Sequence, residues 1–506
     1  MKRWFGAAFV AVLALGLAFR APELTLRPLH NDESVNTFKF RDLYERNAYR
    51  YDPNEYHGPT LEYLTLVPAW LGGARPFNDY SEAMFRAAPV ACGLGLILIL
   101  LPLAGDLGRR ETLFAALFTA ISPAMTYYSR DYIHEILLTF FTALAFVGAW
   151  RFAQTKRMAW ACAAGVGLGL MAATKETFVF ALASMAAAVI WVRWRDQVKV
   201  FQRPCAGGLM AVGIAVVVAL LFFTSFFKNP GGAVDALRAY LPWVHRAGGA
   251  SPHVHPWYFY LQRLFFFHEP GRWFWSEWIV GVLAVAGFFA ARTPLSRIIG
   301  WYTLCLTIIY CALPYKTPWC LLGFYDGMIA LAGIGAAALL ENCRQPQARR
   351  LAALFLILGA GHLGFQAWRC NFGTFRETAV CAQSMNPYVY AQTSPDLLRL
   401  VDTAEGLAKV SPQGMDTLVE VMSPDSYWPL PWYLRRFKQV GYWDKIPPPP
   451  LAPIMIAAKS LDARFDEQRG RTHLMAGYFE IRPGVFLELY VSVDLWGRYV
   501  AAIGRR

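Results

Sequence analysis

Four short polar segments of the sequence hold the residues that could carry out a reaction. They are Asn31-Asp32-Glu33, Tyr127–Glu135, Thr174–Thr177 and Pro314–Trp319. Each offers a carboxylate, a cation or both, beside apolar stretches that shield it partly from water. A carboxylate in such a setting can take a proton from an acceptor hydroxyl, while Lys and Arg can neutralise a phosphate leaving group. These residue types favour transfer of a group away from a phosphate.

The elements that position these segments are predicted to be membrane-spanning helices. Of the 506 residues, 56% are hydrophobic and only 16% are charged. The net charge of +13 comes from Lys and Arg scattered through short loops, a pattern that indicates membrane orientation and not a nucleic-acid partner. We expect an α-helical polytopic membrane protein with about 11 transmembrane helices, each long enough to cross the bilayer. The expected spans are 4–20, 82–104, 111–128, 133–151, 158–173, 177–193, 207–227, 276–291, 298–313, 319–340 and 351–368.

The loops between these spans predict the orientation of the chain. With a cytoplasmic N-terminus, the inner segments hold sixteen Lys and Arg, whereas the short outer loops hold three, namely Arg130, Lys175 and Lys316. The first span then acts as an uncleaved anchor, and we expect a multi-pass protein of the cell (inner or plasma) membrane. Two long outer loops, 21–81 and 228–275, belong to a membrane domain of residues 1–370. Residues 371–506 are predicted to form an extracytoplasmic α/β domain, because short strand-like apolar runs alternate there with helix-like stretches.

This topology brings all four reactive segments to the outer side of the membrane. Within the expected spans, the clear ionisable exceptions are Asp326 and His362. Transporters and pumps usually hold charges near the bilayer midplane, whereas these carboxylates lie at the outer ends of spans. The pattern favours a reaction at the outer membrane surface.

Several motifs together resemble those of a known superfamily. In chain order they are His30-x-Asp32-Glu33, Tyr56-His57-Gly58-Pro59, Tyr128-Ser129-Arg130, Thr174-Lys175-Glu176, Pro256-Trp257-Tyr258, Lys316-Thr317-Pro318-Trp319 and Trp428-Pro-Leu-Pro-Trp432-Tyr433-Leu434-Arg435. The sequence resembles the GT-C superfamily of membrane glycosyltransferases, which includes protein O-mannosyltransferases and lipid A aminoarabinose transferases. It is most similar to a prokaryotic subfamily described as flippase-activity-associated in archaeal glycosylation. The motifs run from the first loop into the tail, so the resemblance covers most of the chain.

The resemblance implies a glycosyltransferase that uses a polyprenyl-phosphate-linked sugar and an extracytoplasmic acceptor, which is a protein, lipid or polysaccharide. Asp32 would be the catalytic base of an inverting transfer, with Glu33 beside it. The short outer segment Tyr128–Glu135 departs from the expected pattern, Ser-Arg-x-x-Arg followed by an acidic pair. Ile133 stands where the second Arg is expected, and His134-Glu135 stand where the acidic pair is expected. Glu135 is the better match for the second acidic residue, and Asp131 stays an alternative.

Charge and aromatic character give the candidates for the other site roles. The candidates for binding the donor phosphate are Arg130, Lys175, Arg246 and Lys316. The candidates for binding the substrates are His30, Tyr56, His57, Glu176, His255, Trp257, Tyr258 and Trp319. A divalent metal ion is a possible cofactor, with Asp32, His134 and Glu135 as its possible ligands.

Other interpretations of these residues stay open. Asn31 or Asp32 can cap a helix that runs to about Arg46, and Lys175-Glu176 can be a polar turn between spans. The aromatic residues of the long outer loop 228–275 can form a belt at headgroup depth. For the whole chain, the alternatives are a lipid-linked-sugar flippase and a noncatalytic partner in a complex that assembles surface glycans.

Overall fold

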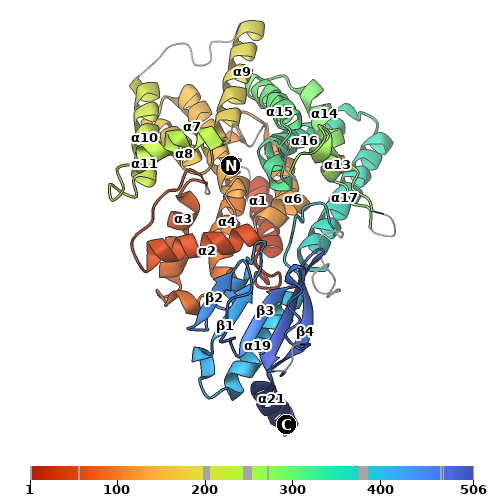
Figure 1. Ribbon diagram of the computed structural model, residues 1–506. Helices are drawn as coiled ribbons and strands as arrows, with labels where there is room; N and C mark the ends of the chain where they lie inside the picture. Colours follow the sequence, from red (N-terminus) through yellow and green to blue (C-terminus); the bar gives the residue numbers. More distant parts are fainter. Residues whose placement is uncertain are drawn as a thin grey trace.

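The computed structural model of the chain has a large helical part and a smaller part built around one β-sheet (Figure 1). It describes residues 3–54, 57–197, 206–242, 253–269, 273–373, 386–467, 470 and 472–504. Tyr56 and Arg246, both predicted site residues, lie outside these ranges. The predicted fold class, a helical membrane protein with a small C-terminal α/β domain, is confirmed.

Seven helical segments among the described residues are long and apolar enough to cross a membrane. Three shorter apolar helices accompany them: α1 (Arg3–Arg20), α8 (Met158–Ala172) and α14 (Trp278–Ala290). The seven are α4 (Glu82–Leu98, continued by a 3-10 turn to Leu103), α7 (Glu135–Thr155), α9 (Phe178–Asp196), α10 (Ala206–Phe223), α15 (Pro294–Ala312), α16 (Leu322–Asn342, preceded by a 3-10 turn from Pro318) and α17 (Pro346–Trp368, followed by a π-turn to Gly373).

The expected span 111–128 is a broken helix. It is divided into α5 (Arg109–Ile121) and α6 (Pro123–Tyr128). Ser122 between them has an extended backbone, and its side chain accepts a hydrogen bond from the Met125 N–H at 3.2 Å. A Ser cap followed by Pro at the first helical position starts a new helix and does not continue the old one. The count of 11 transmembrane helices therefore stays a prediction.

The centre of the bundle is α16, whose side chains are largely buried against α14, α5 and α15. Small residues permit this close packing. A Cβ added to Gly335 would lie 2.0 Å from the Leu283 carbonyl oxygen, and one added to Gly287 would lie 1.9 Å from that of Leu331. Glycines at such contacts bring helix backbones together, which is the usual basis of helix association in membranes.

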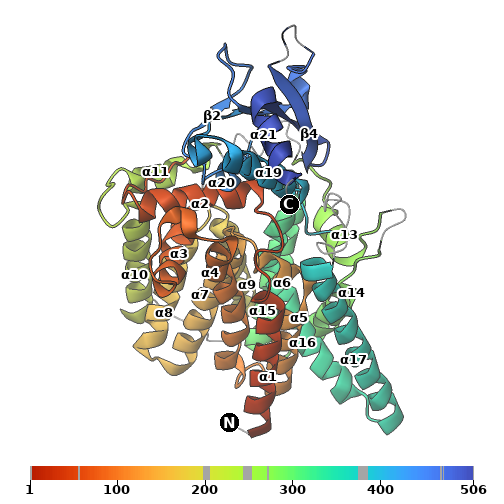
Figure 2. The ribbon, with the colours of Figure 1, turned by 90° about the horizontal axis from the view of Figure 1, so that it is seen from below.

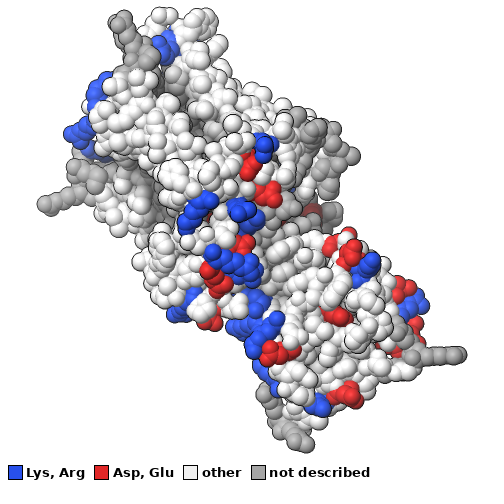
Figure 3. Space-filling model, turned by 60° about the vertical axis from the view of Figure 1, so that its left-hand side comes forward, with Lys and Arg blue, Asp and Glu red and all other residues white. Residues whose placement is uncertain are grey.

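Of the two helices in the first long loop, α2 (Asn31–Tyr44) lies across the end of the bundle, next to the sheet domain, and α3 (Thr60–Leu71) packs beside α4 on the bundle side of α2 (Figure 2). Neither is apolar and long enough to be a span. Figure 3 shows that Lys, Arg, Asp and Glu gather over the sheet domain and the middle of the molecule, whereas the helical end carries a wide uncharged surface. This division fits a bundle that lies in a membrane with its sheet domain outside the hydrocarbon.

The sheet domain contains five strands in the order β2-β1-β3-β5-β4. Strand β1 pairs in parallel with β2 and β3, while β5 pairs antiparallel with β3 and β4. Helices α19 (Asp396–Val410) and α21 (Val493–Ile503) complete the α/β domain. The strands are β1 (Val419–Met422), β2 (Val440–Trp443), β3 (Ile454–Ala458), β4 (His473–Arg482) and β5 (Val485–Ser492).

The sheet domain is hydrogen-bonded to the start of the first long loop. Leu29 is held on both sides, because its N–H donates to the Tyr433 hydroxyl at 2.8 Å and its carbonyl accepts from Thr393 at 2.7 Å. The buried Trp432 indole donates to Glu82 at 3.0 Å. These contacts fix the domain directly beside Asp32.

Candidate functional site

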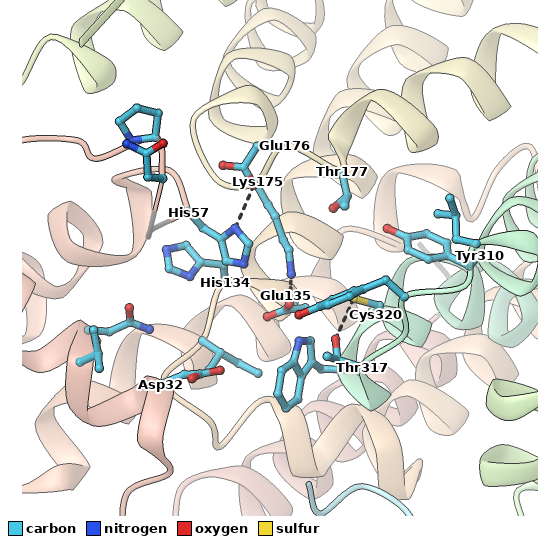
Figure 4. A pocket seen from close by; sticks show the side chains of 18 of the residues that line it. Asp32, His57, His134, Glu135, Lys175, Glu176, Thr177, Tyr310, Thr317 and Cys320 are labelled. Carbon is cyan, nitrogen blue, oxygen red and sulfur yellow. Dashed lines mark hydrogen bonds and ion pairs between the residues drawn. The ribbon is translucent and has the colours of Figure 1, made fainter. Parts of the chain in front are cut away.

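A cavity of about 410 Å³ opens at the junction of the first loop, the helix ends and the sheet domain (Figure 4). It contains side chains from all four polar segments of the sequence, which confirms that the fold brings these segments together. Its lining includes Asp32, Asn36, His57, His134, Glu135, Lys175, Glu176, Thr177, Tyr310, Thr317, Trp319, Cys320 and Trp428.

Asp32 lies in the first turn of α2, and its carboxylate faces the cavity with half of the side chain exposed. The alternative that Asn31 or Asp32 caps this helix is wrong. The cap is His30, whose Nδ1 accepts the Asp32 N–H at 3.1 Å. Its Nε2 lies 2.8 Å from the Tyr390 carbonyl oxygen, to which it can donate a hydrogen bond. The half-exposed Asp32 carboxylate thus has the open approach that a general base needs.

Lys175 and Glu135 form a buried ion pair in the cavity wall (Figure 4). Lys175 belongs to the turn between α8 and α9, and Glu135 begins α7. Burial acts to lower the pKa of Lys175, but the Glu135 carboxylate raises it by more, so the net shift is upward. The ammonium group is thus held charged at the cavity wall.

A second carboxylate in the wall, Glu176, is held by two donors. It accepts from the Tyr51 hydroxyl at 3.0 Å, and its other oxygen lies 2.8 Å from His57 Nδ1. Burial acts to raise the pKa of Glu176, but the charge and hydrogen bond of His57 lower it by more, to about 2. Glu176 therefore presents an ionised acceptor of hydrogen bonds. The His57 ring centroid lies 5.4 Å from that of His134.

Gly58 lets the first loop touch the α8–α9 turn. Its N–H donates to the Thr174 carbonyl at 3.0 Å, and its own carbonyl lies 3.0 Å from His134 Nε2. A Cβ at this position would lie 2.1 Å from the Ala173 carbonyl oxygen. This backbone contact explains why Gly follows His57 here.

Gly58→Ala should destabilise the protein by about 1–3 kcal/mol, because the new methyl group cannot be accommodated without shifting backbone. Thermal unfolding in detergent micelles would measure the change. The matched control is Gly213→Ala in α10, where an added Cβ meets nothing within 4 Å. Equal unfolding temperatures for the two variants would contradict the prediction.

Glu33, predicted to be catalytic, lies outside the cavity and is completely buried. Its oxygens accept from Arg86 Nε at 2.8 Å and Nη2 at 2.7 Å, and also from the backbone N–H groups of His30 and Tyr132, both at 2.8 Å. All its hydrogen-bonding capacity is used within the protein. Glu33 therefore ties α2 to Arg86 of α4 and does not line the cavity.

Asp131 and Arg130 also point away from the cavity. Asp131 pairs with the buried Arg27. Arg130 donates to the carbonyls of Arg20 at 3.0 Å, Pro22 at 2.6 Å and Glu23 at 3.0 Å. Of the two alternatives for the second acidic residue, Glu135 lines the cavity and Asp131 does not.

Part of the segment around Lys316 lines the cavity, and part of it lies outside. Thr317 and Trp319 line the cavity, whereas the Lys316 ammonium donates to the carbonyls of His255 and Leu313. The His255 ring stacks on Phe259 with centroids 4.1 Å apart, also outside the cavity. Two further predicted residues outside it are the exposed Trp257 and Tyr258.

Some lining residues were not predicted as site residues. Asn36 follows Asp32 by one helical turn, and Thr177, Tyr310 and Cys320 flank segments that were already recognised. Helical spacing from the recognised residues is a signal that could have found Asn36. Trp428 carried a stronger signal, since it begins the tail motif Trp428–Arg435.

The predicted metal ligands do not form a metal site in the described part of the chain. There, no group of three or more His, Cys, Asp or Glu residues is arranged to hold a metal ion. Glu135 is already paired with Lys175, and His134 Nε2 is directed at the Gly58 carbonyl.

Comparison with known proteins confirms the fold. The family described as "Dolichyl-phosphate-mannose-protein mannosyltransferase" matches residues 66–223. No curated protein matches the chain by sequence. Among solved structures, ArnT from Cupriavidus metallidurans in the apo state is similar with a TM-score of 0.65 and 13% identity, covering 96% of this chain and 98% of that one.

Two further structures have the same architecture. ArnT from Cupriavidus metallidurans bound to undecaprenyl phosphate gives a TM-score of 0.64 at 14% identity, covering 98% of this chain and 99% of that one. The archaeal oligosaccharyltransferase AglB from Archaeoglobus fulgidus, in complex with an inhibitory peptide and a dolichol-phosphate, gives a TM-score of 0.55 at 14% identity. The match covers 86% of this chain and 64% of that one. The chain thus has the GT-C type of fold that its motifs predict.

Proposed function

We propose that the protein is a membrane glycosyltransferase that moves a sugar from a polyprenyl-phosphate donor to an extracytoplasmic acceptor. The observation that carries this proposal is the cavity, in which the half-exposed Asp32 carboxylate and the charged Lys175 ammonium face one space (Figure 4). Further support comes from the fold, because a similar structure, ArnT, is described as bound to undecaprenyl phosphate. In this proposal the cavity lies on the outer side of the membrane and the N-terminus lies in the cytoplasm.

The reaction begins with proton transfer from the acceptor hydroxyl or amine to the Asp32 carboxylate. The acceptor atom then bonds to the anomeric carbon of the sugar, and the bond from that carbon to the phosphate oxygen breaks. The electron pair leaves with the polyprenyl phosphate. Attack from the side opposite the leaving group inverts the anomeric configuration. The proton is left on Asp32 and passes to water when the product leaves.

Lys175 assists the step in which the phosphate leaves. The departing group is anionic, so it needs a nearby cation more than it needs an acid. Glu135 keeps the ammonium charged and oriented, which prepares it before the donor arrives. Of the four predicted phosphate-binding residues, Lys175 lines the cavity, Arg130 and Lys316 do not, and Arg246 lies outside the described residues.

The other wall residues suit a sugar. The ionised Glu176, fixed by Tyr51 and His57, accepts hydrogen bonds from sugar hydroxyls, and the Thr317 hydroxyl can donate or accept. Trp319 offers an apolar face for the sugar ring. Trp428, from the sheet domain, closes the side next to Asp32, which gives that domain a part in choosing the acceptor.

The test is sugar transfer by the purified protein in nanodiscs, using a panel of radiolabelled polyprenyl-phosphate sugars. The expected result is release of polyprenyl phosphate with one class of donor, together with labelled acceptor. If no donor is turned over, and the protein instead moves labelled lipid between leaflets, the transferase proposal is wrong and the flippase alternative replaces it.

Lys175→Met should reduce the transfer rate by about 10²–10³-fold, because loss of one preorganised group that stabilises a developing anion has this effect. The variant also leaves the Glu135 carboxylate buried without a counter-charge, which destabilises the protein. Lys175→Met combined with Glu135→Gln removes that charge, so it separates a loss of activity from a loss of stability. The matched control is Lys316→Met, whose ammonium lies outside the cavity. A control that loses as much activity as the Lys175 variants would refute the assignment of the phosphate to Lys175.

A further inference from the structure

A second cavity, of about 490 Å³, lies between α9, α14 and α15. The residues that matter to its chemistry are Trp191, Arg195, Asp196, Phe288, Arg297 and Trp301. None of them lines the candidate active site. The second cavity is therefore a separate feature of the membrane domain.

The two cavities lie at opposite ends of the same helices. Helix α9 begins beside Thr177 in the first cavity and ends at Asp196 in the second, after 19 residues that rise about 28 Å. Helix α15 runs the other way, from Pro294 near Arg297 to Ala312 near Leu313, which lines the first cavity. The length of α9 is about the thickness of the hydrocarbon core. The second cavity therefore lies at the membrane interface opposite the active site.

The charges in the second cavity are net positive. The Asp196 carboxylate is paired with Arg297, at 2.6 Å from its Nη1. Arg195 is exposed, and among the residues that the structure describes it makes no ion pair or hydrogen bond. The cavity thus holds two guanidinium groups and one carboxylate, and that carboxylate pairs with Arg297. A guanidinium with free N–H groups binds a phosphate through two parallel hydrogen bonds.

The remaining wall is aromatic. The Trp191 and Trp301 ring centroids are 5.0 Å apart, and Phe288 lies 5.7 Å from Trp301. Rings at this depth contact the glycerol and upper acyl region of a lipid, while the cations reach its headgroup. A site for a soluble anion has no need of such a wall. Basic pockets between transmembrane helices are typical sites for acidic headgroups.

We propose that this cavity binds the phosphate group of an anionic glycerophospholipid in the membrane leaflet opposite the active site. Arg195 contacts the phosphate directly. Arg297 adds a second cation whose position is set by Asp196, and Trp191 with Trp301 packs against the lipid chain. The net positive charge favours phosphatidylglycerol over the zwitterionic phosphatidylcholine.

The experiment is native mass spectrometry of the full chain in detergent, titrated with phosphatidylglycerol or phosphatidylcholine. We expect phosphatidylglycerol to bind more tightly, and we expect Arg195→Ala to weaken its binding about tenfold, because a hydrogen-bonded charge contact is lost. Arg195→Ala removes no hydrogen bond or ion pair among the described residues, so it should fold normally. The matched control is Arg349→Ala with Arg350→Ala at the start of α17, two exposed residues at the same end of the bundle.

Three outcomes would overturn the proposal. The first is equal binding of both lipids by the wild type, and the second is an equal loss of binding in the control. The third is displacement of the lipid by glycerol phosphate at comparable concentration, which would assign the cavity to a soluble phosphate compound. Arg195→Lys, which keeps the charge, should retain more binding than Arg195→Ala.

Discussion

Asp32→Asn should lower the rate of sugar transfer by about 10²–10⁴-fold, which is the usual contribution of a positioned general base. Asn has nearly the shape of Asp but cannot take a proton from the acceptor. The carboxylate is half exposed, with His30 Nδ1 3.9 Å away, and its favourable place at the helix N-terminus contributes at most about 1 kcal/mol. The variant should therefore fold and bind donor. The measurement is release of polyprenyl phosphate under single-turnover conditions, together with thermal unfolding.

The matched control for this variant is Asp42→Asn. Asp42 lies on the same helix, outside the cavity, in an exposed pair with Arg46. Its replacement should leave transfer unchanged. If Asp32→Asn retains more than about a tenth of the wild-type rate, the base is another group and the proposed mechanism fails.

Arg86→Met should have the largest effect on stability, about 3–5 kcal/mol, because it leaves the Glu33 carboxylate buried without a counter-charge. Arg86 also donates to the carbonyls of Leu24 and Arg27, at 2.6 and 2.8 Å, so the segment that leads into α2 should loosen as well. Chemical denaturation in detergent micelles would measure the loss. Replacing the pair by Glu33→Leu with Arg86→Met should recover most of it, since a well-packed apolar pair removes the stranded charge. A double variant as unstable as the single one would contradict this explanation.

The same pair predicts how stability depends on pH. Burial acts to raise the pKa of Glu33, but the charge and hydrogen bonds of Arg86 lower it by more, so the net shift is downward from the ordinary value of 4.5. As the pH falls below about 4.5, Glu33 in the folded protein therefore binds fewer protons than Glu33 in the unfolded chain. The contribution of Glu33 is present above pH 4.5 and is lost as the pH falls below that value. Arg86→Met should remove this part of the pH dependence.

The spans and the gathering of the four polar segments could be predicted because they depend on composition and on charge bias between loops. Which member of each segment faces the cavity could not be. Asp32 and Glu33 are neighbours, but successive helical residues point about 100° apart, so one carboxylate faces the cavity and the other is directed at Arg86. The sequence alone does not tell which of the two meets a distant arginine.

The segment that follows α6 presents the same difficulty. Asp131 and Glu135 both follow α6, and the resemblance left the choice between them open. The decision comes from their partners, because Arg27 holds Asp131 whereas Lys175 holds Glu135 at the cavity wall. Likewise, capping by a His side chain is not among the common helix starts, so the role of His30 could not be anticipated.

The hydrogen bonds between the sheet domain and the first loop also bear on when the protein becomes active during its synthesis. His30, which holds the first turn of α2, is itself held by Tyr390, 360 residues later in the chain. Leu29, just before it, is bonded to Tyr433, 404 residues later. The chain must therefore be made at least as far as Tyr433 before the residues beside Asp32 find all these partners. In the proposed function, transfer then begins only after the sheet domain has folded onto the first loop.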